Sequence, residues 1–449
     1  MFFKFGFAIL FLIISLVSIK TCKKIFNPVT VFCGLWTIII FLSVLQLYDL
    51  KKSSYWTYFC IGIGVVFYII GFYFDYNFFK VKEFKICIKK QAYSRKLTKT
   101  YEYKPNYKII YPLVIILLFT KLFTAKKSIL TLLAGGNLDT VLLLTRAASQ
   151  DARGTIMNVI HNLLTGPFEF AIYPILAYNI FNKKHTILSG TILIILLLGI
   201  VSTGGRSNLI YLMVCLCVVF TFSNKNLIGY SEQIKKIKKN KRHFIILGVV
   251  FIISFVIISI SRSGQKLFKH MYLYFAMQPV MFETWVDIVK EKGIWGFGIA
   301  SFNGFTFHIL YLLKNIFKLT YPKHWYDIFN MILCVDSDWK PITNSGLPAN
   351  AYVSVFWYFY LDGREIGIII LSFIFGIISG HYFKNAVKRQ NMKNICLYAI
   401  ILFCIADTYV RIRFAVSDYV GGFLLLNFLL FKKYEVNNQF SKKTGDLKT

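Results

Sequence analysis

The chain has 449 residues, of which 56% are hydrophobic and 18% aromatic, and its mean hydropathy is +0.58. A soluble protein of this size would expose much of that apolar surface to water, so the composition excludes an ordinary soluble enzyme or binding protein. The 52 Lys and Arg against 20 Asp and Glu give a formal net charge of +32. Because the basic runs form short loops between apolar blocks, they favour a role in membrane topology over nucleic-acid binding.

Apolar blocks recur along the chain at about the length that a helix needs to cross ~30 Å of hydrocarbon. We therefore expect an all-α polytopic transmembrane bundle, a single integral membrane domain over residues 1–449 with about eleven spans. The first block lacks a small-residue cleavage site, so we interpret it as an anchor and not as a signal peptide. In chain order the expected spans are residues 3–19, 28–47, 55–75, 109–125, 155–178, 186–202, 208–223, 244–260, 366–383, 394–410 and 417–431.

The distribution of Lys and Arg predicts the orientation of these spans. One set of alternate loops holds 28 of the 42 Lys, and assigning it to the cytoplasm places the N-terminus outside and the C-terminus inside the cytoplasmic (inner) membrane. The predicted outer side then includes a large external loop, 261–365, which should contain short helices and a dipping helix at 351–361. The segments assigned to the cytoplasm are residues 20–27, 76–108, 179–185, 224–243 and 384–393, together with the end of the chain from Lys432, which includes the tail 433–449.

Arginine is distributed in the opposite way to lysine. Seven of the ten Arg fall on the predicted outer side, namely Arg146, Arg153, Arg206, Arg262, Arg364, Arg411 and Arg413. Guanidinium is planar, always charged and able to bind two phosphate or carboxylate oxygens at once, so an outer cluster indicates an anionic ligand near the headgroups. For any single Arg the alternative is snorkelling, or an ion pair with Asp139, Asp151, Asp362, Glu365 or Asp418.

Four of these arginines should lie at one depth in the membrane. Arg206 occupies a hairpin, residues 202–207 (STGGRS), that is too short to leave the membrane surface. The two glycines before it would let the backbone approach an anion closely, beside a helix N-terminus. Arg262 directly follows a span, and Arg411 and Arg413 follow another. This common depth matches the headgroup of a lipid pyrophosphate.

Histidine and intramembrane carboxylates are the candidate proton acceptors. His308 lies in an apolar, helix-like stretch of the large external loop, where it is either a structural histidine or a general base. Glu169 lies inside a predicted span with no local partner in the sequence, and ionisable groups at that depth are usually paired or functional. Asp407 stands four residues before Arg411, a spacing that predicts an ion pair on one helix face.

Several catalytic and cofactor motifs are absent from the sequence. It contains no P-loop, GxGxxG, GxSxG or HExxH pattern and no zinc-ligand spacing, so we expect no cofactor and no metal. The nine Cys lie in predicted spans or on the predicted cytoplasmic side, apart from Cys334, and indicate no disulfide framework. Covalent acyl chemistry, metallohydrolysis and ATP-driven transport therefore have no support.

Several stretches resemble, in the same order, parts of the Wzy-type oligosaccharide repeat-unit polymerases of bacterial surface polysaccharides (O-antigen or capsule). Residues 26–42 (FNPVTVFCGLWTIIIFL) look like the second span of that family, 202–213 (STGGRSNLIYLM) like its arginine hairpin, and 261–264 (SRSG) like the start of its large external loop. Residues 348–376 are similar to an Asn/Tyr-containing stretch of the family. Asp362-Gly363-Arg364 replaces the Asp-Phe-Gly-like turn of that stretch.

The resemblance implies a glycosyltransferase that moves a growing glycan from one polyprenyl pyrophosphate to the non-reducing end of a second lipid-linked unit. The reaction would occur at the outer face of the cytoplasmic membrane and need no nucleotide, because the sugar–pyrophosphate bond supplies the driving force. The implied partners are the polyprenyl-pyrophosphate-linked oligosaccharide, membrane lipids, a chain-length regulator and a flippase, and no nucleic acid.

Roles for the candidate residues follow from this chemistry. Arginine would stabilise the departing pyrophosphate, and His308 or Glu169 would take the proton from the attacking hydroxyl. Asp362 would position the acceptor. The arginines expected to bind pyrophosphate or other anionic groups are Arg206, Arg262, Arg411 and Arg413. Arg146 and Arg153, from an expected amphipathic helix in loop 126–154, would hold the second lipid.

Three other interpretations stay open. An O-antigen ligase would share the architecture and chemistry but use a lipid A-core acceptor. A lipid-linked oligosaccharide flippase would be a transporter with charges along a central cavity. A glycosyltransferase that uses a polyprenyl monophosphate sugar would depend on carboxylates in the first outer loop, which here is short and holds only Asp49.

Overall fold

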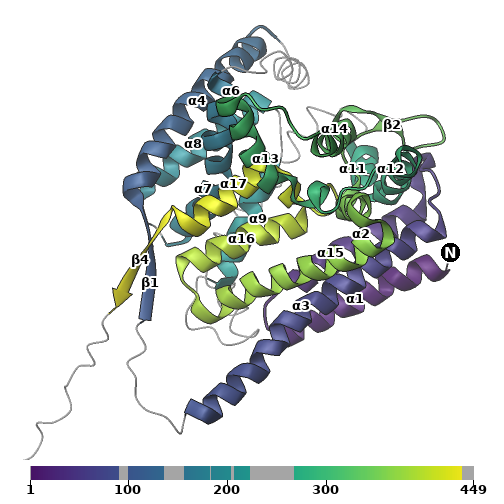
Figure 1. Ribbon diagram of the computed structural model, residues 1–449, viewed down its shortest axis with the longest axis horizontal. Coiled ribbons are helices and arrows are strands. Elements are labelled where there is room, and N and C mark those ends of the chain that lie inside the picture. Colours follow the sequence, from purple (N-terminus) through teal and green to yellow (C-terminus); the bar gives the residue numbers. More distant parts are fainter. Residues whose placement is uncertain are drawn as a thin grey trace, which may run out of the picture.

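The computed structural model describes residues 2–90, 100–135, 156–182, 184–203, 207–222 and 267–436. This part is mostly helical, and its apolar helices pack into one bundle (Figure 1). The bundle helices are α1 (Phe2–Cys22), α2 (Pro28–Leu45), α3 (Tyr55–Lys90), α4 (Tyr107–Leu133), α6 (Ile156–Ile160), α7 (Gly166–Asn182), α8 (Thr186–Thr203), α9 (Ser207–Phe222), α15 (Ser354–Arg389), α16 (Met392–Ala406) and α17 (Ser417–Phe428).

Residues 267–353 form a group of shorter helices at one end of the bundle, which we call the helical cap. This is the described part of the segment expected to be a loop with short helices. The cap consists of α11 (Leu267–Ala276), α12 (Gln278–Lys292), α13 (Ile299–Phe317), α14 (Lys323–Ser337) and a hairpin of β2 (Lys340–Pro341) and β3 (Pro348–Ala349). The remaining short elements are η1 (Leu47–Asp49), the π-helical turn η2 (His161–Thr165), η4 (Arg413–Ala415), and the antiparallel strands β1 (Thr100–Pro105) and β4 (Phe431–Val436).

Five of the described helices are long and apolar enough to cross a membrane, and three shorter apolar helices accompany them. Large apolar side chains on α1 and α4 face outward, with Ile9 59%, Phe119 66% and Phe123 71% exposed. Such a surface would be costly in water but suits lipid, so the chain is a membrane-embedded helical bundle. The five long candidates are Lys4–Cys22, Pro28–Leu45, Tyr55–Tyr76, Tyr107–Thr131 and Ser354–Arg389. The expected total of about eleven spans stays a prediction, because residues 244–260 lie outside the described residues.

The stretch at 351–361 differs from its expected form as a separate dipping helix. Its residues from Ser354 onward are the first part of α15, which continues into the following apolar span. Helical geometry breaks at Gly363 and at Arg364, whose φ of 55° and ψ of −142° lie outside the helical region. Two helical parts are therefore joined by a kink of two residues and not by a loop.

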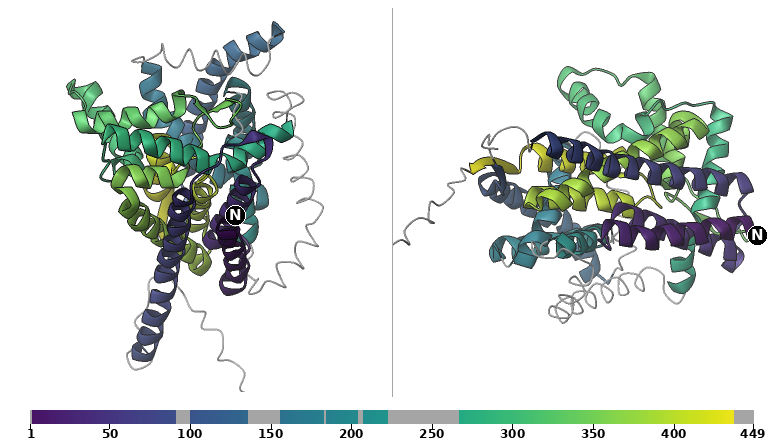
Figure 2. Two further views of the ribbon diagram at one scale, coloured as in Figure 1. Left: turned by 90° about the vertical axis from the view of Figure 1, so that its right-hand side faces the viewer. Right: turned by 90° about the horizontal axis from the view of Figure 1, so that it is seen from below.

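Helices α3 and α15 lie side by side along much of their length (Figure 1). Two glycines allow this close approach, because a Cβ on Gly71 would lie 2.0 Å from the carbonyl oxygen of Phe373 and one on Gly376 would lie 2.1 Å from that of Tyr68. Small residues at such crossings let helix backbones pack closely in a membrane. The helices α1, α2 and α3 run along one common direction (Figure 2).

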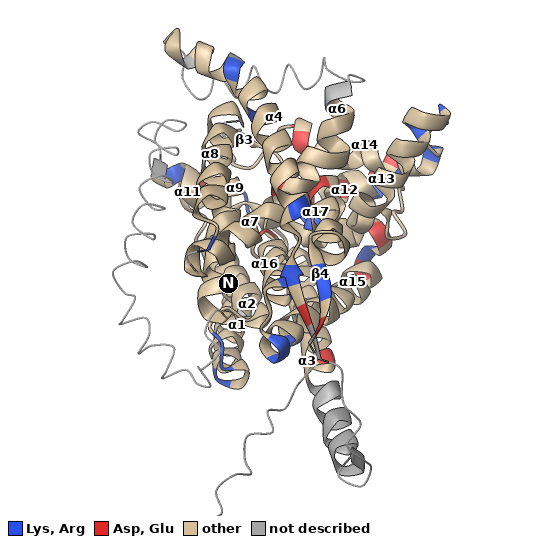
Figure 3. Ribbon diagram, turned by 90° about the vertical axis from the view of Figure 1, so that its left-hand side faces the viewer, with Lys and Arg blue, Asp and Glu red and all other residues tan. Residues whose placement is uncertain are grey.

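Loops that are far apart in the sequence gather at opposite ends of the bundle. At one end the cap contacts the α2–α3 loop, where the Asp49 carboxylate accepts hydrogen bonds from Nδ2 of Asn344 at 2.9 Å and from the backbone N–H of Ser345 at 2.7 Å. At the other end strands β1 and β4 lie beside the α7–α8 and α15–α16 loops. Most of the bundle carries no charge, whereas β4 carries both signs (Figure 3). These two groups of loops are the ones that the lysine distribution assigns to opposite sides of the membrane.

Candidate functional site

A group of ionisable and hydrogen-bonding side chains lies where the bundle meets the helical cap. It is built from α4, η2, α7, α9, α13 and α17, so it combines the bundle with one cap helix. We call it the polar cluster, and it consists of Lys121, His161, Glu169, Tyr173, Asn208, His308 and Asp418.

Glu169 is the most heavily bonded member of the polar cluster. Its Oε1 accepts hydrogen bonds from the Tyr173 hydroxyl and from Nδ2 of Asn208, both at 2.9 Å, and its Oε2 lies 2.7 Å from Nζ of Lys121. The expectation that Glu169 has no local partner is therefore wrong, since Tyr173 follows it by one helical turn. Only 7% of Glu169 is exposed, so these three contacts replace the water that its carboxylate lacks.

His308 presents one ring nitrogen without a hydrogen bond. Its Nδ1 lies 2.9 Å from the carbonyl oxygen of Gly304 in the preceding turn of α13. Because a carbonyl oxygen only accepts, Nδ1 is the donor in this contact, and in a neutral ring the lone pair is then on Nε2. Within the described part of the chain, the buried Nε2 has no hydrogen-bond partner. Nε2 is therefore the ring nitrogen that could accept a proton.

Asp418 links His308 to the rest of the polar cluster. It lies in the first turn of α17, where the helix dipole favours a negative charge. Electrostatic interactions connect Asp418 with His161, His308 and Glu169, so all three groups lie close to this carboxylate. Among the described residues no hydrogen bond reaches its buried Oδ1. His161 is exposed and Asp418 is half-buried.

Close packing of α7 against α17 holds these groups in place. A Cβ on Gly166 would lie 2.5 Å from Oδ1 of Asp418, and a Cβ on Gly421 would lie 2.7 Å from Pro167 and 3.1 Å from Nε2 of His308. His161 belongs to the π-helical turn that precedes α7, a distortion that occurs frequently at functional sites. The carboxylate and the imidazole are therefore positioned by helix contacts that only glycine permits.

Two of the arginines expected to bind an anion are paired with acids. Nη1 and Nη2 of Arg411 lie 2.8 Å and 2.5 Å from the two carboxylate oxygens of Asp336, which ties the end of α14 to the bundle. Nε of Arg413 lies 2.7 Å from Oδ2 of Asp407 as an ion pair without the alignment of a hydrogen bond. The expected side-chain pair between Asp407 and Arg411 is therefore wrong. The chain turns after α16, so the spacing of four residues no longer places both side chains on one helix face.

Asp362, just before the α15 kink, and Arg364, within it, both contact the cap. Nη2 of Arg364 donates to the carbonyl oxygen of Ile294 at 2.9 Å, and its guanidinium lies over the Trp295 ring at 4.9 Å. The Asp362 carboxylate accepts the backbone N–H groups of Ala300 and Ser301 at 2.9 Å and 2.8 Å. Both Asp362 oxygens therefore cap the first turn of α13, where orphan N–H groups need acceptors. This geometry presents Asp362 as a support for the helix that carries His308, and its expected contact with the acceptor stays a prediction.

The other four candidate arginines, Arg146, Arg153, Arg206 and Arg262, lie outside the described residues. The position of Arg206 in the sequence is nevertheless informative. Asn208 follows it by two residues and donates a hydrogen bond to Glu169. The hairpin expected to bind an anion is thus adjacent in the chain to the polar cluster.

Sequence reasoning missed three ionisable members of the polar cluster, as well as Tyr173 and Asn208, although a signal for the three was present. Lys121, His161 and Asp418 all stand inside blocks that were predicted as spans. Glu169 was selected because ionisable residues at membrane depth are usually paired or functional. The same rule applies to each of these three residues. Their convergence depends on the packing of separate helices, which no local pattern reveals.

Comparison with protein-family models, with curated proteins and with solved structures finds no match to this chain. In the parts of the chain that the structure describes, no three His, Cys, Asp or Glu side chains are grouped so that they could hold a metal ion.

Proposed function

We propose that this chain is a polymerase of lipid-linked oligosaccharide repeat units at the outer face of the cytoplasmic membrane. It transfers the growing glycan from a polyprenyl pyrophosphate to the non-reducing end of a second lipid-linked unit. The observation that supports this best is that His308, whose buried Nε2 makes no hydrogen bond within the described residues, interacts electrostatically with Asp418 at the end of the bundle that the helical cap covers.

In the proposed reaction the acceptor sugar hydroxyl attacks the anomeric carbon of the donor. The new C–O bond forms as the bond to pyrophosphate breaks, and the pyrophosphate leaves with the electron pair. The hydroxyl proton passes to Nε2 of His308, and the negative charge of Asp418 stabilises the resulting imidazolium. Glu169 is a weaker candidate for the base, because Tyr173, Asn208 and Lys121 occupy its oxygens.

Arginine stabilises the leaving group in this proposal. Arg206 is the leading candidate, since it stands two residues before Asn208 of the polar cluster, and Arg262 is the second. Arg146 and Arg153 hold the second lipid. Arg411 and Arg413 are less suited to direct contact, because an anion would have to compete with Asp336 and Asp407 for them.

The proposed orientation places the cap outside and the strands β1 and β4 on the cytoplasmic side. It follows the excess of lysine in the loops at the β1–β4 end. Proposed partner proteins are a chain-length regulator and a flippase that delivers the substrate.

The test is to incubate the purified protein with a synthetic polyprenyl-pyrophosphate-linked repeat unit and separate the products by size. We expect a ladder with the unchanged chain and none with His308→Ala. His324→Ala is the matched control, because His324 is an exposed histidine of the cap, and it should keep the ladder.

Other outcomes would favour the alternatives. Product formed only when a lipid A-core acceptor is added would indicate a ligase. Movement of the lipid-linked unit across vesicles without any new glycosidic bond would indicate a flippase. No product under either condition would refute a transferase.

A further inference from the structure

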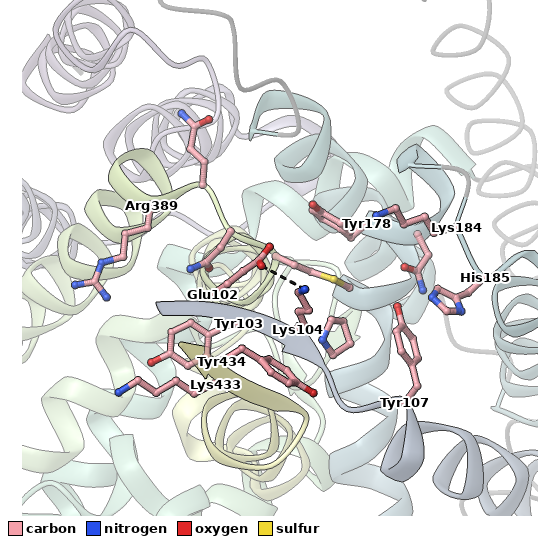
Figure 4. Close-up of a pocket in the computed structure, with 15 residues that line it drawn as sticks. Glu102, Tyr103, Lys104, Tyr107, Tyr178, Lys184, His185, Arg389, Lys433 and Tyr434 are labelled. Carbon is pink, nitrogen blue, oxygen red and sulfur yellow. Dashed lines mark ion pairs between the residues drawn. The ribbon is translucent and has the colours of Figure 1, made fainter. Parts of the chain in front are cut away.

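A second site lies at the end of the bundle opposite the helical cap. It is a pocket of about 940 Å³, which we call the basal pocket. Figure 4 shows that its walls come from segments far apart in the sequence: β1 and the start of α4, the α7–α8 turn, the α15–α16 turn, and β4. It shares no residue with the polar cluster, so a ligand of the basal pocket would bind independently of the proposed transferase activity.

The basal pocket carries an excess of positive charge. Its lining includes one acid, Glu102, and four basic residues, Lys104, Lys184, Arg389 and Lys433. Lys104 lies 3.4 Å from Glu102, and both side chains are more than half exposed, so water screens that pair strongly. The remaining three cations give the pocket a positive potential that favours an anion.

Aromatic side chains are interleaved with these charges. The lining includes Tyr103, Tyr107, Tyr178 and Tyr434, together with His185, whose ring lies 3.9 Å from that of Tyr107. Tyrosine is enriched where membrane meets water, because its ring is apolar and its hydroxyl is not. The pocket therefore combines basic groups with side chains typical of the interface.

A buried amide in the wall lacks hydrogen bonds of normal geometry. Asn179 is 1% exposed, and within the described residues neither its Nδ2 nor its Oδ1 makes a hydrogen bond, although the Tyr107 hydroxyl lies near. Buried amide groups usually have partners. Two other lining residues, His185 (φ 50°) and Gln390 (φ 40°), adopt the left-handed conformation, which is uncommon for residues with a side chain. Unsatisfied polar groups and strained backbone of this kind concentrate where ligands bind.

The lining residues also define the depth of the basal pocket. Tyr107 begins α4, Arg389 ends α15 and Met392 begins α16, so the pocket opens where apolar helices end. That is the level of lipid headgroups. Basic pockets between membrane helices at this level bind phosphate-bearing headgroups.

We infer that the basal pocket binds a phosphate-bearing anion, and specifically the phosphate of an anionic lipid headgroup in the adjoining leaflet. Lys184, Arg389 and Lys433 supply the charge, the amide of Asn179 and the tyrosine hydroxyls supply hydrogen bonds, and the aromatic rings contact the glycerol and upper acyl region.

The experiment measures lipid retained by the full chain after purification, with native mass spectrometry, as phosphatidylglycerol or phosphatidylcholine is titrated in. The test variant is K184Q/R389Q/K433Q. The matched control is K292Q/K318Q/K323Q, which removes the same charge from exposed lysines of the cap. Asn179→Asp is a second test variant, because it adds a like charge to the pocket while barely changing its shape.

We expect phosphatidylglycerol to bind the unchanged chain and the control alike, and to bind both test variants about tenfold more weakly or worse, since each basic residue near an anionic headgroup adds measurably to binding. Phosphatidylcholine should show no such difference. A second arm adds millimolar inorganic phosphate in place of the lipid. If the unchanged chain binds free phosphate and both test variants do not, the pocket is a phosphate site whose ligand comes from solution and not from a lipid. Equal binding of both ligands to all variants would overturn the inference.

Discussion

Nζ of Lys121 lies 2.7 Å from Oε2 of Glu169, with both side chains only 13% and 10% exposed. This contact joins α4 to α7 in the part of the bundle that faces the helical cap. Two opposite charges held this deep in apolar surroundings depend on each other, because neither is solvated well enough to remain charged alone.

The first prediction concerns this pair. Glu169→Gln leaves the Lys121 ammonium without a counter-charge, so we expect a loss of about 3 kcal/mol in the free energy of unfolding. Denaturant unfolding in detergent measures this free energy for the unchanged chain and the variant. The double variant K121M/E169Q is the control and should lose less than the two single changes added together. An E169Q protein as stable as the unchanged chain would show that the pair contributes nothing.

The second prediction concerns Asp418. If its charge stabilises a protonated His308, then Asp418→Asn should lower the rate of polymer formation by about 100-fold while the fold persists. The rate of ladder formation with the synthetic repeat unit measures this. Asp327→Asn removes an exposed carboxylate of the cap and should leave the rate unchanged. Equal rates for the two variants would remove Asp418 from the mechanism.

The third prediction concerns Arg206. Arg206→Lys keeps the charge but loses the planar fork that binds two phosphate oxygens, so polymer should disappear while protein abundance stays the same. Arg242→Lys, in a loop assigned to the cytoplasm, is the matched control. Polymer of normal length from the R206K chain would exclude Arg206 from the site.

The fourth prediction separates two roles for Arg411. The two hydrogen bonds between Arg411 and Asp336 indicate that Arg411 stabilises the packing of α14 on the bundle. Asp336→Asn should then destabilise the protein by about 1 kcal/mol, as expected for a partly exposed pair, and the exchange R411D/D336R should restore part of the loss. Thermal unfolding measures both. If Asp336→Asn left stability unchanged and raised substrate affinity, Arg411 would be a ligand for the substrate and not a structural residue.

The fifth prediction concerns acid stability at the cap. Hydrogen bonds from Asn344 and Ser345 lower the pKa of Asp49 below its ordinary value of 3.8. A carboxyl whose pKa is lower in the folded state stabilises the fold above the ordinary value, and that stabilisation is lost as pH falls through the folded value. The unchanged chain should therefore unfold at a higher temperature than Asp49→Asn at pH 7, and the difference should shrink below pH 3.8. A difference that did not vary with pH would rule out ionised Asp49 as its cause.

Local patterns account for most of the helices. The apolar blocks predicted at 28–47 and 186–202 correspond closely to α2 and α8, because a helix that contacts lipid needs an unbroken apolar sequence of that length. The partition of loops by lysine content also agrees with their grouping at two ends of the bundle. Both features depend on the composition of short segments, which can be read directly from the sequence.

The partners of individual charges were not predictable in this way. Asp407 and Arg411 have the spacing of a helical pair, yet each bonds elsewhere, because α16 ends at Ala406, just before Asp407. The ion-pair partner of Glu169 is Lys121 on α4, 48 residues earlier in the chain.

By itself, the amino-acid sequence determined that this is a membrane-embedded helical protein, since hydrocarbon thickness and charge solvation act on each segment separately. Only the tertiary structure decided that His308, Asp418 and Glu169 meet, and that four basic segments line one pocket. Such sites form between helices. The angle and depth at which two helices pack depend on contacts such as those of Gly71 and Gly421, and each of these contacts involves residues from two separate segments.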